Sequence, residues 1–499
     1  MRTFTLLEYS ILFGYLTVVA AIGAAFYRKQ STAKDYFLGG KSMSWLPVGI
    51  SIVAADLSAI TLMGVPAWMF QNNYEMAWGF LGPALAAPIM IYVFIPFYSG
   101  LNLYTAYEYL ERRFDLRVRL VTSALFLFLR LVHVAIAIYG PSLAMSLATG
   151  LPMYQCVLGI GALTTLYTTS GGVRAVIWTD VIQFSTICLG VTGILWAALR
   201  QIDGGARETV RLAWEAGRLG FWNPSLNPSD TMAFWPSIIG GTTLTLASLA
   251  TDQALIQRLF TTRSGRDAKQ SIVANAVLQV PLLLLLGLVG TVLFAFYRQH
   301  PELLAGLPNN DAILPFFAVQ QLPRGICALV IAAIFAATMA VMSAGINSLS
   351  TAFTVDFYQR LWRPEESPRH YATFGRAATA AWGAVATLLA LFMGRLGALV
   401  LAYAKVSSLV GGPMLGIFLL GMLTRRATAV GTLYGAVAGA AAVAAVAAFT
   451  NVSFYYHVFV GMAITVLGGY LASRFTAPPS STQLDGLVME RSWSWKTQA

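Results

Sequence analysis

An aspartate lies in the middle of an apolar stretch near the N-terminus, together with two hydroxyls, a glycine and a proline. The stretch runs Ile50-Ser-Ile-Val-Ala-Ala-Asp-Leu-Ser-Ala-Ile-Thr-Leu-Met-Gly-Val-Pro66 and contains Asp56, Ser58 and Thr61. Because a bilayer core has no water to satisfy such groups, a continuous lipid-facing helix accommodates them poorly. The pattern favours a transmembrane helix that is interrupted and presents carbonyls and side chains to a small solute or ion. The alternative is an ordinary kinked helix in which Asp56 pairs with a neighbour.

A second interrupted helix is predicted between residues 234 and 258. Its centre, Gly240-Gly-Thr-Thr-Leu-Thr-Leu-Ala-Ser-Leu-Ala-Thr-Asp-Gln253, combines two glycines and five hydroxyls with the pair Asp252 and Gln253. It comes five apolar spans after the first interrupted stretch. Two interrupted spans at corresponding positions of two five-helix halves are typical of an inverted-repeat transporter, which binds its solute and ion where the helices break.

The sequence contains no pattern that indicates an enzyme. Its three cysteines, Cys156, Cys188 and Cys327, lie in apolar spans without metal-site spacing, which is typical of small buried hydrophobic residues. CxxC, HExxH, GxSxG and P-loop motifs are missing from it. We therefore predict no catalytic residues and no cofactor other than a coupling ion.

The composition predicts an integral membrane protein. Hydrophobic residues make up 57% of the 499 residues and charged residues only 11%, whereas soluble domains carry about 25% charged residues. The net charge of +11 does not indicate nucleic acid, because Arg and Lys lie mainly in short loops between apolar spans, where they set the orientation in the membrane.

Apolar stretches of ~20 residues, the length that crosses a bilayer, predict an all-α fold with about thirteen transmembrane helices. Their limits are near 7–27, 44–69, 78–98, 120–147, 153–170, 175–200, 234–258, 271–297, 322–357, 371–393, 400–421, 428–449 and 454–474. Basic loops after the first, third, seventh and eleventh spans place the N-terminus outside and the C-terminus in the cytoplasm of the plasma (inner) membrane. Residues 1–475 then form one transporter domain, which we expect to function as a monomer, and 476–499 form a short cytoplasmic tail.

Several segments resemble the sodium:solute symporter family, which includes proline, sugar, iodide, monocarboxylate and sialic acid cotransporters. These segments are Asp35-Tyr-Phe-Leu-Gly-Gly-Lys41, Thr105-Ala-Tyr-Glu-Tyr-Leu-Glu-Arg-Arg-Phe114, Gly171-Gly-Val-Arg-Ala-Val-Ile-Trp-Thr-Asp-Val-Ile-Gln183, Asn347-Ser-Leu-Ser-Thr-Ala-Phe-Thr-Val-Asp356 and Gly411-Gly-Pro413. The resemblance, strongest to the sialic acid, proline and iodide–monocarboxylate branches, implies a LeuT-type fold of five plus five inverted helices. One helix would precede the two repeats (about 44–200 and 234–421) and two would follow them.

The resemblance implies a main sodium site made of backbone carbonyls and two hydroxyls. The carbonyls map to Ala54, Leu57 and Ala337. The hydroxyl positions on the ninth span are Ala340 and Val341, and neither side chain offers oxygen to a hard cation. The proline symporters have an aspartate at the position of Asp56 that bears on sodium binding, so we expect Asp56 to supply the missing ligand.

A second sodium site, found in some members of the family, is half present in this sequence. It maps to Asp180 and Ser343, while alanines occupy the positions of two further serines. These departures leave open an alternative in which protons replace sodium as the coupling ion, through Asp56, Asp180 or His133.

The resemblance also implies where a solute would bind. Ser58 and Thr61 match hydroxyls that sialic acid symporters direct at a carboxylate, and His133 stands where those symporters have an arginine. Met76 and Phe80 replace an aromatic residue and a glutamine, so the sugar-type polar clamp is missing. The full set of candidate positions is Ser58, Thr61, Met76, Phe80, Arg130, His133, Asp252, Gln253 and Lys405. They favour a small solute, with a carboxylate as the preferred chemistry, over a sialic acid or a hexose.

Lys405 lies within the eleventh predicted span, where relatives have a small polar residue. A lysine at membrane depth costs ~3 kcal/mol unless it is paired or hydrated. Its ammonium group either holds a substrate carboxylate, replaces the absent sodium, or reaches the interface from the end of the span. The function predicted from the sequence is sodium-coupled import of a small organic solute by alternating access; a channel or a sensor has no supporting feature.

Overall fold

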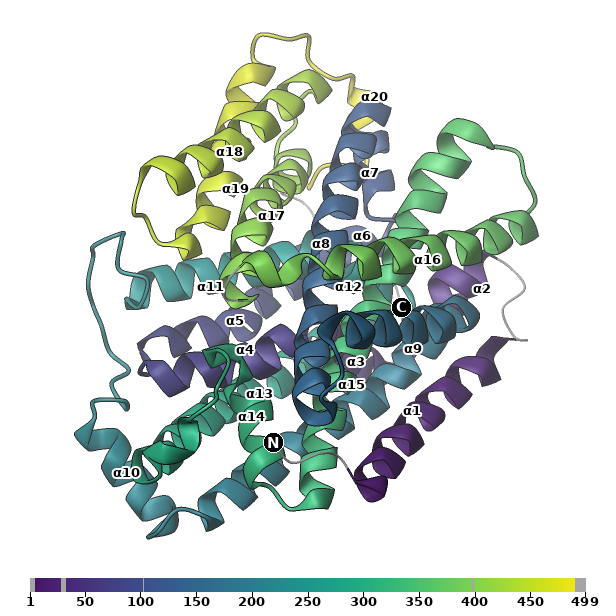
Figure 1. The fold of residues 1–499 in the computed structure, drawn as a ribbon. Coiled ribbons are helices and arrows are strands. Elements are labelled where there is room, and N and C mark those ends of the chain that lie inside the picture. The colour runs from purple at the N-terminus through teal and green to yellow at the C-terminus, as the bar shows by residue number, and fades with distance from the viewer. Residues whose placement is uncertain (1–4, 28–32, 102, 397–398, 490–499) are drawn as a thin grey trace.

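The computed structural model describes residues 5–27, 33–101, 103–396 and 399–489, which form an all-helical protein (Figure 1). The first helices are α1 (Leu6–Tyr27), α2 (Ala33–Leu38), α3 (Trp45–Asp56), α4 (Ala59–Gln71), α5 (Gly82–Ile89), α6 (Ile95–Ser99), α7 (Tyr107–Arg113), α8 (Leu116–Thr149) and α9 (Met153–Arg200). The others are α10 (Gly205–Glu215), α11 (Phe234–Thr251), α12 (Gln253–Phe260), α13 (Gly265–Gln299), α14 (Ile313–Gln321), α15 (Arg324–Ala352), α16 (Pro368–Ala390), α17 (Leu399–Leu423), α18 (Ala429–Phe449), α19 (Phe454–Ser473) and α20 (Ser481–Leu484). The predicted all-α architecture is confirmed.

The number of membrane-crossing helices stays a prediction. Among the residues that the structure describes, eight helical segments are long and apolar enough to cross a membrane, or nine if α3 and α4 count as one span. These two helices are bent by 62° at their junction, as expected for an interrupted span between residues 44 and 69. Length and composition therefore establish a multi-pass membrane protein but not thirteen spans.

The first break lies at Leu57 and Ser58, between α3 and α4. Their φ/ψ angles, −81°/88° and −83°/171°, are not helical. The Leu57 N–H still donates to the Val53 carbonyl, and α4 restarts where the Leu62 N–H bonds the Ser58 carbonyl. Carbonyls at the end of α3 and amides at the start of α4 therefore lose their helical partners at this point.

The second predicted break is at Asp252, between α11 and α12. The Asp252 backbone is extended (φ/ψ −80°/116°), and its carboxylate accepts from the Ala254 N–H at 2.8 Å. This is an N-cap, an arrangement that aspartate favours. A further kink at Gly172 (φ/ψ 55°/−175°) divides α9 near the boundary between the predicted spans 153–170 and 175–200.

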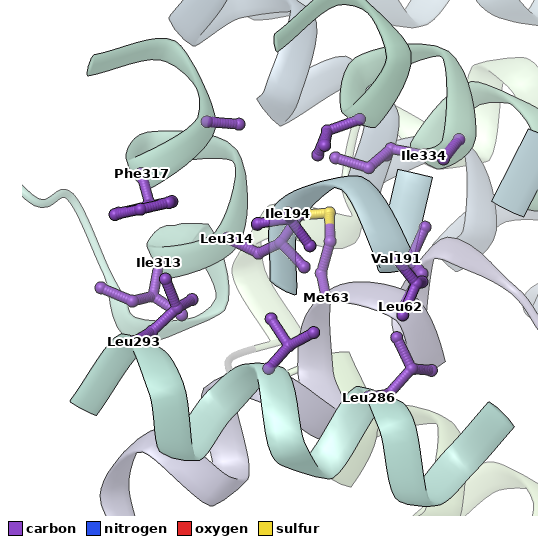
Figure 2. Packing of buried hydrophobic residues seen from close by; sticks show 14 of the residues in the cluster. Leu62, Met63, Val191, Ile194, Leu286, Leu293, Ile313, Leu314, Phe317 and Ile334 are labelled. Carbon is purple, nitrogen blue, oxygen red and sulfur yellow. The ribbon is translucent and has the colours of Figure 1, made fainter. Parts of the chain in front are cut away.

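Two large apolar cores hold the helices together and meet along α3. One of them contains side chains of α4, α9, α13, α14 and α15, which point toward one another in Figure 2. The other joins α3 to α7, α8, α12 and α17, with Tyr107, Phe126 and Phe418 among its members. Because Ile52 of α3 belongs to the second core and Val53 and Leu57 to the first, the first break lies where the two cores meet.

Glycines allow α11 to approach the segment that begins α5. A Cβ atom on Gly82 would lie 2.6 Å from the Gly241 carbonyl oxygen, and one on Gly241 would lie 2.7 Å from the Gly79 carbonyl oxygen. Small residues at such crossings let membrane helices pack backbone to backbone. This contact positions the helix that carries the second break.

We expect Gly241→Val to destabilise the protein by about 1–3 kcal/mol or to prevent folding, because the added side chain meets the backbone of Gly79. The melting temperature of the purified protein in detergent measures the effect. Gly159→Val is the matched control, since a Cβ there has no atom within 4 Å. Equal melting temperatures for the two variants would contradict the packing described for Gly241.

Candidate solute and ion site

The carboxylate at the first break is held by a chain of two amides from α13. The Gln279 Nε2 donates to Asp56 Oδ2 at 2.6 Å, and the Asn275 Nδ2 donates to Gln279 Oε1 at 2.9 Å. Asp56 is partly exposed, whereas both amide side chains are buried. One amide N–H therefore reaches the carboxylate directly and the second amide orients the first, while Asp56 keeps part of its surface exposed.

Ser58 and Thr61 lie on the first turn of α4. Ser58 is the N-cap residue, it is buried, and its side chain makes no capping hydrogen bond. Met76 and Phe80 are buried in the same apolar core as Leu57 of the break. The start of α4 thus combines hydroxyls with a nearby apolar core.

Arg130, His133 and Asp252 come together at the second break. Arg130 Nη2 lies 3.4 Å from Asp252 Oδ2, and Arg130 Nη1 lies 2.8 Å from His133 Nδ1. Arg130 and His133 on α8 are both buried. Because a guanidinium only donates hydrogen bonds, Nδ1 of His133 accepts here and its Nε2 carries the proton of the neutral imidazole.

A small cavity of about 20 Å³ lies beside the second break, between α8, α11 and α17. Its polar lining consists of His133, Ser248, Thr251, Asp252 and Ser407. The Ser407 hydroxyl is buried and has no hydrogen-bond partner among the described residues. Ser248 is one of the five hydroxyls of the predicted second interrupted helix, although it was not predicted as a solute position, and Ser407 was not predicted at all.

Asp180, predicted as a sodium ligand, forms a buried ion pair with Arg258 of α12. Arg258 Nη2 donates to Asp180 Oδ2 at 2.9 Å. Ser51 of α3 donates to the same oxygen at 2.5 Å and accepts from Arg258 Nε at 2.7 Å. The other predicted ligand, Ser343, donates to the Ala340 carbonyl at 3.1 Å. Arg258 was not predicted from the sequence as the partner of Asp180.

The positions on α15 that were predicted for the main sodium site are buried and offer no side-chain oxygen. Ala337, Ala340 and Val341 are at most 1% exposed, and α15 packs against α3. The adjacent hydroxyl, Thr338 Oγ1, donates to the Ala137 carbonyl of α8 at 3.1 Å. Only backbone oxygens of α15 are therefore left for an ion at these positions.

Of two further predicted solute positions, the structure describes the side chain of Gln253 but not that of Lys405. Gln253 donates its Nε2 to the Tyr104 carbonyl and accepts from the Ala106 N–H with its Oε1, both at 3.0 Å. Its amide thereby ties the start of α12 to the segment before α7. Lys405 belongs to α17, but its side chain lies outside the described part of the protein.

An ion-pair network joins α7 to α8 and to the helical segment that follows α15. Arg119 Nη2 lies 2.6 Å from Asp356 Oδ1 and its Nη1 lies 2.7 Å from Glu111 Oε2, while Arg360 Nη2 lies 2.7 Å from Glu111 Oε1. Partial burial raises the pKa of Glu111, but the hydrogen bonds from Arg360 and Arg119 outweigh it, so this pKa lies below its ordinary value. The network fixes α7 against α8 and the segment that follows α15.

The two broken helices and the groups gathered at their breaks define a secondary transporter of the LeuT type. The model of the sodium:solute symporter family matches residues 36–439, and the chain belongs to this family. It is therefore a transporter and not an enzyme, as predicted.

Known relatives carry organic acids and iodide. The chain is 34% identical to the sodium/sialic acid symporter NanT of Aliivibrio fischeri, with 97% of each chain covered. It is 31% identical to the human sodium-coupled monocarboxylate transporter 1, over 88% of this chain and 72% of that one. The human sodium/iodide cotransporter is 30% identical over 83% of this chain and 64% of that one.

Two solved structures share the fold. A substrate-bound, outward-open Na⁺-coupled sialic acid symporter with a novel Na⁺ site superposes with a TM-score of 0.87 at 32% identity, covering 95% of this chain and 99% of that one. The nucleobase-cation symporter Mhp1 in a closed conformation gives a TM-score of 0.58 at 13% identity, covering 92% of this chain and 99% of that one. At that identity, the second match shows the fold alone.

We expect Arg130→Gln to destabilise the protein by about 3–5 kcal/mol, because it leaves the Asp252 carboxylate buried without its partner. The double variant Arg130→Gln/Asp252→Asn should recover part of that loss, since the asparagine can still cap α12. Thermal unfolding of the unmodified protein, Arg130→Gln, Asp252→Asn and the double variant in detergent measures the effect. A double variant as unstable as the sum of the two single changes would show that the ion pair contributes nothing.

Proposed function

We propose that the protein imports a small carboxylated solute together with sodium, by alternating access. The observation that carries this proposal is the open break between α3 and α4. The C-terminal end of α3 carries partial negative charge and the N-terminal end of α4 partial positive charge. One junction therefore offers a cation site and an anion site side by side, as in transporters with discontinuous helices.

The solute carboxylate would bind at the start of α4. The alternative, the start of α12, is already capped by the Asp252 carboxylate, which would repel a second anion. Ser58 at the start of α4 makes no capping bond with its side chain, and Thr61 follows one turn later. Relatives named for sialic acid and for monocarboxylates, both of which carry a carboxylate, support this choice.

Sodium would bind at the end of α3. The family site maps to the carbonyls of Ala54, Leu57 and Ala337, which are suitable oxygen ligands for a hard cation. In place of the two missing hydroxyls, Asp56 would contribute its carboxylate, held by Gln279 at 2.6 Å. The relatives named as sodium symporters support sodium as the coupling ion.

Alternating access would act through the buried ion pairs that connect the second break to neighbouring helices. Arg130 links the break to α8, and Arg258 links α12 to Asp180 of α9 and Ser51 of α3. A solute and an ion that bind one arrangement of these helices more tightly shift the population of outward and inward states. The ion pairs are the contacts that must be remade when the broken helices move.

The second candidate function uses protons in place of sodium. It is favoured by Ala340 and Val341, which leave the main sodium site without hydroxyls, and by two carboxylates within the helices, the partly exposed Asp56 and the buried Asp180. We further propose, from the basic loops, that the N-terminus lies outside and the C-terminus in the cytoplasm of the plasma (inner) membrane. The protein would function there as a monomer.

Uptake into proteoliposomes distinguishes the two coupling ions. A thermal-shift screen of monocarboxylates, amino acids and sugars, with and without sodium, first identifies a solute, because bound ligand stabilises the native state. We expect an inward sodium gradient to drive accumulation of that solute and a proton gradient alone to have no effect. Accumulation that is independent of sodium and driven by the proton gradient would instead establish proton-coupled import.

Substitutions at Asp56 and Gln279 test the proposed ion ligand. We expect Asp56→Ala to abolish uptake with normal membrane expression, because the ion loses its carboxylate. Gln279→Met should raise the sodium concentration for half-maximal uptake about tenfold, the effect of losing a hydrogen bond to a charged group.

Ser271→Ala is the matched control for Gln279→Met. The Ser271 hydroxyl donates to the Trp45 carbonyl at 3.0 Å, so the variant also loses a bond between α13 and α3 but none to Asp56. Its sodium dependence should equal that of the unmodified protein. Near-normal uptake by Asp56→Ala would remove Asp56 from the coupling mechanism.

A further inference from the structure

A cavity of about 450 Å³ lies at the ends of α7, α17 and α18, away from the helix breaks. Its walls are Arg113 and Phe114 at the end of α7, residues 427–430 at the start of α18, and the segment after α19 (residues 476–480 and Gln483). No acidic residue lines it. Apolar residues make up most of the lining, and its polar members are Arg113, Thr428, Thr476, Ser480 and Gln483.

Arg113 is a fully buried arginine in the wall of this cavity with unused hydrogen-bonding capacity. Its Nε donates to the Gly421 carbonyl at 3.1 Å and its Nη2 to the Thr424 carbonyl at 2.7 Å. Its Nη1 has no hydrogen-bond partner within the described residues. A buried charge that is not neutralised is costly, so an anion bound beside Arg113 would be strongly favoured.

The N-terminus of α18 faces the same cavity. Thr428 caps this 21-residue helix by accepting from the Gly431 N–H at 3.2 Å, and Ala429 and Val430 of its first turn line the cavity. The start of a helix carries partial positive charge and free amides, which bind phosphate groups. The helix end and the buried guanidinium thus supply two independent sources of positive potential.

Hydroxyls line part of the cavity, and Arg426, which is not among the lining residues, holds the segment after α19. The hydroxyls of Thr428 and Thr476 lie 2.7 Å apart, and Ser480 lines the cavity near them. Arg426 Nη2 donates to the Thr476 carbonyl at 2.7 Å. Gln483 closes the cavity by donating to the Phe114 carbonyl at 2.9 Å. The Arg113 guanidinium and the first amides of α18 are therefore the donors that match the acceptor oxygens of a phosphate group, because the Thr476 hydroxyl already donates to the Ser473 carbonyl.

We propose that this cavity binds a phosphate-bearing anion, supplied either by the headgroup of an anionic lipid or by free phosphate. Basic pockets between membrane helices on the cytoplasmic side bind lipid headgroups. The adjoining helices α18 and α19 are only 28% buried within the protein along their apolar windows, so lipid reaches them. The site is separate from the helix breaks, and its occupancy does not depend on which solute is carried.

Two experiments on the full-length protein separate the sources of the anion. Inorganic phosphate is titrated against the detergent-solubilised protein, and melting is compared in nanodiscs of phosphatidylcholine with and without phosphatidylglycerol. A headgroup site predicts stabilisation by phosphatidylglycerol, and a free-phosphate site predicts stabilisation by inorganic phosphate alone. A melting temperature that responds to neither probe overturns the proposal.

Substitutions of residues that line the cavity test whether the stabilising anion binds there. Val430→Glu places a carboxylate at the start of α18, where a negative charge is compatible with helix stability, and should weaken binding of the effective probe about tenfold or more. Val430→Gln is the neutral control of similar size and should bind normally. Arg113→Gln should also lose the response. Unchanged binding by Val430→Glu and by every folded Arg113→Gln preparation would place the anion elsewhere and refute the assignment.

Discussion

Backbone groups inside a membrane must find hydrogen-bond partners, and the site depends on the two places where helices interrupt their own bonding. At the second break, Asp252 satisfies the start of α12 with its own carboxylate. At the first break, Ser58 does not cap α4 with its side chain. The second junction is therefore capped by the protein's own carboxylate, whereas the first is the junction at which we propose that ligands of both charges bind. This difference between two corresponding breaks determines where the proposed ion and solute would bind.

Charges at membrane depth must also be compensated, and the protein does this by connecting separate helices. Arg130 joins α8 to the second break, and Arg258 joins α12 to α9 and α3. Pairs of this kind add little net stability compared with apolar contacts, but removing one partner is costly. These ion pairs therefore favour one arrangement of the broken helices over arrangements that leave a buried charge unpaired. Asp56 is different, because its carboxylate accepts a hydrogen bond from the neutral amide of Gln279, and we propose that its negative charge serves a bound cation.

The sequence predicted the helix breaks well because polar residues, glycine and proline inside apolar spans are costly unless the helix is interrupted. It predicted the partners of those residues poorly. Asp180 and Arg258 are 78 residues apart, and Asp56 and Gln279 are 223 apart. Their pairing depends on how each helix is rotated, and a helix that is apolar on all sides carries no signal of its rotation. Gln279 and Ser407 were missed for that reason. The count of thirteen spans rests on apolar length alone, which the kink at Gly172 and the bend at Leu57 make ambiguous.

The central claim is that the coupling ion is held at the first break by Asp56 and not by side chains of α15. The position of the bound ion tests this most directly, in cryo-electron microscopy maps of the protein in sodium and in an impermeant organic cation. We predict density present only in sodium, in contact with the Asp56 carboxylate and the carbonyls of Ala54 and Leu57. Sodium-dependent density beside Asp180 and Ser343, with none at Asp56, would contradict the account.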